Sequence, residues 1–167
     1  MDDRLWRKNT DTLAILGWGT ILFGAWSIIK AIATYATNAD LIKALIRQFT
    51  EQENIERTVM LAIIIIYIGI LCADVIARFY VGASARAQAR GKKKRNGYII
   101  ITYFLIALYV FEVAENIFQI FNPYERTESI INVIVNAFIN FSSLVTLIEL
   151  VVYAKRIKRT MMEVQHE

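Results

Sequence analysis

The sequence predicts an all-α polytopic membrane protein, a four-transmembrane-helix bundle with both termini on the cytoplasmic side (N-in/C-in). The chain of 167 residues is 56% hydrophobic with a mean hydropathy of +0.42, which is more apolar than a soluble domain of this size needs for one core. Four apolar runs each reach the roughly 20 residues that a helix needs to cross a bilayer. Basic residues gather at the ends of these runs and orient them. We therefore expect a single membrane domain over residues 1–167.

The first apolar run, residues 12–36, is predicted to be a retained span. An Ala-x-Ala pattern at residues 31–33 raises the alternative of a secretory signal, but the apolar stretch 13–29 is longer than the about 7–15 residues of a signal core. Small or hydroxylated residues recur at spacings of three and four along one face, which allows another helix to approach closely in lipid. This predicted helix-packing face comprises Gly17, Thr20, Gly24, Ser27 and Ala31.

Residues 38–50 are predicted to form an interfacial helix on the outer surface. Leu41, Leu45 and Phe49 recur on one face, while Lys43 and Arg47 lie on the other. Such amphipathic helices lie in the plane of the membrane surface. A helix docked on a partner protein would have the same pattern.

The second run, residues 58–80, is predicted to be a span that contains an ion pair. It is rich in β-branched residues but much longer than the 4–8 residues of a typical buried strand. Asp74 and Arg78 are four residues apart, so their side chains meet on one face of a helix. Because the two charges can satisfy one another, we interpret the pair as structural.

Residues 81–97 are predicted to be a basic cytoplasmic loop. No acid interrupts the stretch from Arg78 to Arg95. One interpretation is a topological anchor, because short basic loops stay in the cytoplasm. The other is a contact with anionic lipid headgroups. The candidate residues for that contact are Arg86, Arg90, Lys92, Lys93, Lys94 and Arg95.

The third and fourth runs, residues 98–121 and 128–154, carry a candidate polar interior. An ionisable group in hydrocarbon costs about 2.5–3.5 kcal/mol, so acids in a span are functional candidates by default. The acids, with Lys30 at a matching depth, form either a structural polar layer or a proton or cation pathway. The asparagines either cross-bond helices or line a wet cavity. The set comprises Glu112, Glu115, Asn116, Asn132, Asn136 and Asn140.

The distribution of positive charge predicts the topology. Fourteen Lys and Arg residues lie in the segments assigned to the cytoplasm, which include the basic tail 155–167, when Arg78 at the inner end of the second span is counted with the basic loop; five lie elsewhere. The five are Lys30, Lys43, Arg47, Arg57 and Arg126. This bias predicts a multi-pass protein with both termini in the cytoplasm. We expect the plasma membrane as its location.

Missing residues argue against most enzyme classes. Cys72 is the only cysteine, which excludes an intramolecular disulfide. The only histidine, His166, lies at the C-terminal end and away from the spans, so we expect no bis-His haem ligation, His-based zinc site or His-activated nucleophile. Gly91 and the lysines after it lack the spacing of a phosphate-binding loop. We therefore expect no enzyme activity, metal or cofactor. Nucleic acid is not an expected partner, because lipid headgroups are closer to the basic residues.

The leading functional hypothesis is a small non-enzymatic membrane protein that acts by helix–helix association. Its expected partners are the lipid bilayer, including anionic lipids, and another membrane protein or a second copy, as an accessory subunit or a homo-oligomer. The alternative is a transporter or channel component in which Glu112 and Glu115 bind protons or cations. A lipid-modifying or lipid-binding enzyme is the least supported class, because no phosphate-handling or nucleophile motif occurs.

Overall fold

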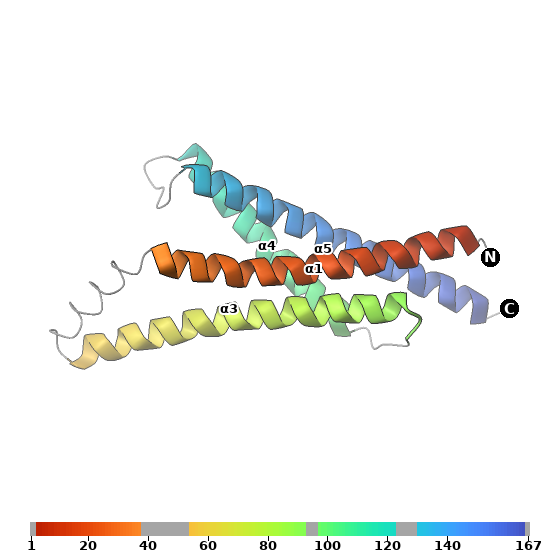
Figure 1. Ribbon diagram of the computed structural model, residues 1–167, viewed down its shortest axis with the longest axis horizontal. Coiled ribbons are helices and arrows are strands. Elements are labelled where there is room, and N and C mark those ends of the chain that lie inside the picture. Colours follow the sequence, from red (N-terminus) through yellow and green to blue (C-terminus); the bar gives the residue numbers. More distant parts are fainter. Residues whose placement is uncertain (1–2, 38–53, 93–96, 123–129, 166–167) are drawn as a thin grey trace. The chain divides into compact units, whose positions relative to one another are not determined.

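The computed structural model describes residues 3–37, 54–92, 97–122 and 130–165, and its elements are four long α-helices (Figure 1). They are α1 (Asp3–Thr37), α3 (Asn54–Ala89), α4 (Gly97–Phe121) and α5 (Ile130–Gln165). Each contains a segment long and apolar enough to cross a membrane: Trp6–Ala33, Ile65–Ala89, Gly97–Phe121 and Ile130–Thr160. The predicted all-α class is confirmed, as are four helices long and apolar enough to span a membrane. The predicted interfacial helix, residues 38–50, lies outside the described residues.

Three helices extend beyond the predicted spans: α1 begins at Asp3 instead of residue 12, and α3 and α5 continue past their predicted C-terminal ends. α3 continues through residues 81–89, which were expected to begin the basic loop, and α5 continues through residues 155–165, which were expected to be a tail. Both extensions are rich in Ala, Arg, Lys and Gln, which favour helix, and neither contains proline. Basic residues in these segments therefore do not end the helices.

The chain divides into two compact units. Unit 1 comprises Met1–Ile21 and Phe79–Glu167, so it contains the start of α1, the end of α3, and all of α4 and α5. Unit 2 is Leu22–Arg78 and contains the remainder of α1 and α3.

The core of unit 1 is a set of buried stripes, one on each helix. α4 packs against α5, and its buried residues recur every three or four positions, as expected for one helix face. Buried residues on α4 are Tyr98, Thr102, Leu105 and Tyr109; on α5 they are Val133, Ser143, Leu147, Leu150, Val151, Ala154 and Ile157; α1 adds Leu13 and Thr20, and α3 adds Val81, Ser84 and Ala85. Between Tyr109 and its end at Phe121, α4 has no fully buried residue. The core therefore lies mainly at the end of unit 1 that holds the start of α4 and the ends of α3 and α5.

Glycine terminates α3 in a defined way. Gly91 has a φ of +73°, in the left-handed region. The N–H of Gly91 donates to the Gln88 carbonyl at 3.0 Å, and that of Lys92 donates to the Ala87 carbonyl at 3.1 Å. These two bonds form a Schellman motif, which satisfies carbonyls that the helix end would leave unpaired.

We expect Gly91→Ala to lower the free energy of unfolding by about 1 kcal/mol, because a side chain disfavours the left-handed conformation by roughly 1–2 kcal/mol. A Cβ at Gly91 would meet nothing within 4 Å, so crowding does not contribute. Titration with SDS in mixed micelles measures the loss. Gly91→Asn should lose less, since Asn adopts this conformation more readily. Equal losses for the two variants would contradict the explanation.

Candidate functional site

Two glycines allow α1 and α3 to cross at close range in unit 1. A Cβ built on Gly82 would lie 2.5 Å from the Gly17 carbonyl oxygen and 2.6 Å from Cγ1 of Ile21. A Cβ on Gly17 would lie 2.8 Å from the Gly82 carbonyl oxygen. All three distances are shorter than real Cβ contacts allow, so the crossing requires glycine on both helices.

The rest of the predicted helix-packing face is also largely covered. Thr20 and Gly24 are buried, and Ser27 and Ala31 are half-buried. The Thr20 hydroxyl donates to the Leu16 carbonyl at 2.9 Å, so its polar group is satisfied within α1. The sequence interpretation missed Gly82 because it placed that residue in a loop. The signal was present, since Gly82 opens a run of small residues through Ala85.

Arg86 lies across the same crossing. A Cβ on Gly17 would be 2.8 Å from Cγ of Arg86, so the aliphatic part of this side chain occupies the space that glycine leaves. Its guanidinium carbon lies 3.7 Å from the centroid of the Trp18 ring, a cation–π contact. Arg86 is half-buried, whereas Arg90 and Lys92 are exposed. The other candidate lipid-contact residues, Lys93, Lys94 and Arg95, lie outside the described residues.

A polar contact joins three helices of unit 1. The buried hydroxyl of Tyr98 on α4 donates to Oε1 of Gln88 on α3. Nε2 of Gln88 donates to the Ala154 carbonyl on α5 at 3.1 Å. Sequence reasoning missed this contact, and the only signal was that Val81, Ala85 and Gln88 share one helical face. An isolated sequence does not show which helix that face meets.

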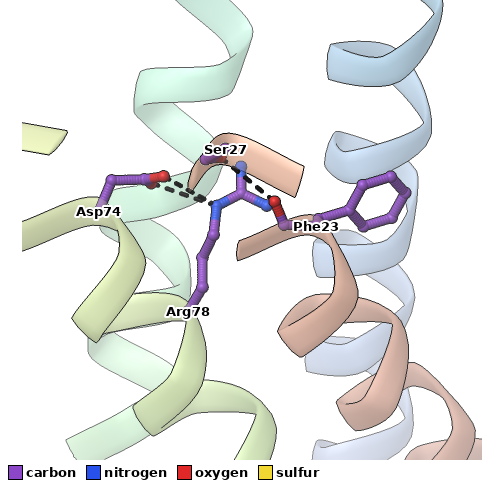
Figure 2. A network of polar contacts seen from close by, with 4 residues as sticks. All are labelled: Phe23, Ser27, Asp74 and Arg78. Atoms are coloured by element: carbon purple, nitrogen blue, oxygen red, sulfur yellow. Dashed lines mark hydrogen bonds and ion pairs between the residues drawn. The ribbon is translucent and has the colours of Figure 1, made fainter. Parts of the chain in front are cut away.

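The ion pair lies in unit 2. Nε of Arg78 is 3.2 Å from Oδ1 and 3.1 Å from Oδ2 of Asp74. The Arg78 side chain is 2% exposed and that of Asp74 is 23% exposed. Figure 2 shows the guanidinium pointing toward Phe23 and Ser27 of α1, where the Ser27 hydroxyl donates to the Phe23 carbonyl at 3.2 Å. The predicted ion pair and a residue of the predicted packing face therefore meet at one place.

The six residues of the candidate polar interior lie at or near the surface of the described chain. On α4, Glu112 and Glu115 are exposed and Asn116 is half-buried. Nδ2 of Asn116 donates to the Glu112 carbonyl at 2.8 Å, and Gln119 donates to the Glu115 carboxylate at 3.2 Å. On α5, Asn132 is exposed and both Asn136 and Asn140 are half-buried. Their role in an interior stays a prediction, because a further helix would have to cover this face.

Among the residues that the structure describes, no group of three or more His, Cys, Asp or Glu side chains is arranged to hold a metal ion. Comparisons of the chain with models of protein families, with curated proteins and with solved structures found no match.

Proposed function

We propose that this small multi-pass membrane protein has no enzyme activity and acts by helix–helix association, either with a second copy or as an accessory subunit. The observation that supports this proposal is the exposure of two acids on the spanning part of α4. Glu115 lies six residues before the end of α4 at Phe121, about 9 Å along the helix. At that depth, a carboxylate facing lipid is costly, and a polar group on a neighbouring helix lowers the cost.

Apolar side chains around the acids provide the area for helix packing. Phe111, Ile117 and Phe118 on the same part of α4 are 75%, 48% and 52% exposed. In lipid, apolar exposure alone does not drive association, because lipid chains are as apolar as these residues. The acids provide an electrostatic and hydrogen-bonding attraction to a partner helix, and the exposed apolar side chains provide van der Waals contact.

A second copy of the chain carries a suitable cation. Lys30 is exposed and lies three residues before the end of the span Trp6–Ala33. With both termini in the cytoplasm, α1 and α4 run in the same direction, so Lys30 and Glu115 both lie in the outer part of the bilayer. Lys30 of one copy therefore matches Glu115 of another in both charge and depth.

The proposal includes the topology and the plasma membrane as location. The charge count, fourteen basic residues against five, supports cytoplasmic termini. Exposed cations at the start of α1 and the far end of α5, such as Arg7 and Lys158, fit the same orientation. The predicted topology is tested by labelling single cysteines placed at Gly91 and at Gln52 in a Cys72→Ala background, where only the Gln52 position should be labelled from outside. Labelling of the Gly91 position from outside would contradict this topology.

Glu115→Gln is expected to weaken association about 3–30-fold, since interhelical polar contacts in membranes contribute about 0.6–2 kcal/mol. Crosslinking and blue-native electrophoresis of native membranes measure the associated fraction. Glu149→Gln, which neutralises an exposed acid elsewhere on α5, is the matched control and should have no effect. Lys30→Glu together with Glu115→Lys should restore association between copies. A wild-type protein that remains monomeric in native membranes would refute the proposal.

The alternative function, a transporter or channel component, is favoured by the position of Glu112 and Glu115 one turn apart on an exposed face. Flux of protons or cations into liposomes distinguishes the two functions. Flux in the wild-type protein that disappears in Glu112→Gln and Glu115→Gln, with association unchanged, would favour this alternative. No flux in the wild-type protein would exclude it.

A further inference from the structure

Arg86 is held in a fixed position by two residues of α1. Its aliphatic stem lies against Gly17, where any Cβ would collide with it, and its guanidinium stacks on the Trp18 ring at 3.7 Å. Arg86 lies in the last turn of α3, three residues before the end of the span Ile65–Ala89. A cation is thus positioned in advance near the end of the spanning part of α3.

The stacked guanidinium keeps its hydrogen-bonding capacity. Stacking uses the face of the planar group, whereas its five N–H donors lie in the plane and point outward from its edge. Within the described residues, the guanidinium of Arg86 has the contact with Trp18 and no hydrogen bond or ion pair. These donors match a phosphate, which arginine binds in a bidentate manner.

Further cations lie at the same end of unit 1. Lys155 on α5 has its Nζ 5.2 Å from the Tyr103 ring, and Cζ of Arg156 is 5.5 Å from the Tyr153 ring. Tyrosine and tryptophan are typical of the membrane–water interface. The exposed cations of this end are Arg4, Arg7, Lys8, Arg90, Lys92, Lys155, Arg156, Lys158 and Arg159. Each basic residue near an anionic membrane surface contributes about 1 kcal/mol of attraction.

We infer that Arg86 and Trp18 form a binding site for the phosphate of an anionic phospholipid in the leaflet on the side of the chain termini. Trp18 is 50% exposed and lies within the span Trp6–Ala33, so the site opens toward the acyl chains as well as the headgroups. A ligand that fits must carry both a phosphate and apolar chains. A soluble phosphate and a nucleic acid lack the apolar chains. Arg90, one turn further along α3, adds a second cation toward the aqueous side.

Quenching of Trp18 fluorescence by brominated lipids tests this site directly. Trp6→Phe and Trp26→Phe leave Trp18 as the only tryptophan, and the purified protein is placed in vesicles of phosphatidylcholine with phosphatidylglycerol. Bromine is carried either by the anionic or by the neutral lipid. We expect stronger quenching by the brominated anionic lipid, and the ratio of the two values reports the local enrichment of that lipid for each variant.

Arg86→Gln is expected to reduce this enrichment about fivefold, which corresponds to the loss of about 1 kcal/mol of attraction. Arg86→Lys should keep part of it, and Lys158→Gln, which removes an exposed charge without a ring contact, should keep nearly all. Unfolding curves in mixed micelles verify that the variants remain folded. An equal loss in the Arg86 and Lys158 variants would overturn the site and leave only general charge attraction. Reversal of the enrichment by soluble glycerol phosphate would overturn the assignment to a lipid.

Discussion

Asp74→Ala is expected to lower the free energy of unfolding by about 3 kcal/mol, the low end of the range for removing one partner of a buried ion pair. The substitution leaves the Arg78 guanidinium, only 2% exposed, without its carboxylate. The low end of the range applies because the Asp74 side chain is 23% exposed, so the pair is only partly buried. Titration of the purified protein with SDS in mixed micelles measures the change, and Asp74→Asn should show a smaller loss in the same assay.

Removing both charges provides the control. Asp74→Leu combined with Arg78→Met replaces the pair by apolar side chains of similar size, and such replacements are often neutral or stabilising. The double variant should therefore be more stable than Asp74→Ala alone. If instead each single change cost little and the two losses simply added, the pair would not be coupled. The structural interpretation of the pair would then fail.

Hydropathy was sufficient to predict the four spanning helices, but not where the helices end. Lipid cannot form hydrogen bonds with the backbone, so a single long apolar segment must satisfy its N–H and C=O groups as a helix. Composition alone therefore identifies each candidate span. The ends of α3 and α5 depend instead on helix propensity and on packing against other helices. Ile157, in the segment expected to be a tail, is completely buried. The physical reason is that charge places a segment outside the membrane and says nothing about what it packs against.

Local spacing predicted some contacts of the candidate site and missed others. Asp74 and Arg78 lie on one helix, so the four-residue spacing alone brings them together. The contacts of Gly82 and Gln88 join different helices, and they depend on the crossing point and register of those helices. For Glu115 the sequence indicates a position inside a span, but which side of the helix is covered depends on tertiary packing.

Gly82→Ala is expected to lower the free energy of unfolding by about 2 kcal/mol. The added methyl would lie 2.5 Å from the Gly17 carbonyl oxygen and 2.6 Å from Cγ1 of Ile21, so α1 and α3 must move apart. Overpacking of this kind costs about 1–3 kcal/mol, and a backbone atom yields less easily than a flexible side chain. The greater helix propensity of alanine, about 1 kcal/mol, offsets only part of this cost.

The other helical glycines make the comparison decisive, because the same substitution meets different surroundings. Gly17→Ala should also destabilise, since its methyl would lie 2.8 Å from both the Gly82 carbonyl oxygen and Cγ of Arg86. At Gly19 the nearest atom would be Cγ2 of Thr146 at an ordinary 3.5 Å, and at Gly69 nothing lies within 4 Å. Gly69→Ala should therefore be neutral or stabilising by up to about 1 kcal/mol, with Gly19→Ala close to neutral. The same unfolding titration applied to all four variants measures these effects. A loss at Gly69 as large as at Gly82 would show that the close crossing of α1 and α3 does not cause the loss at Gly82.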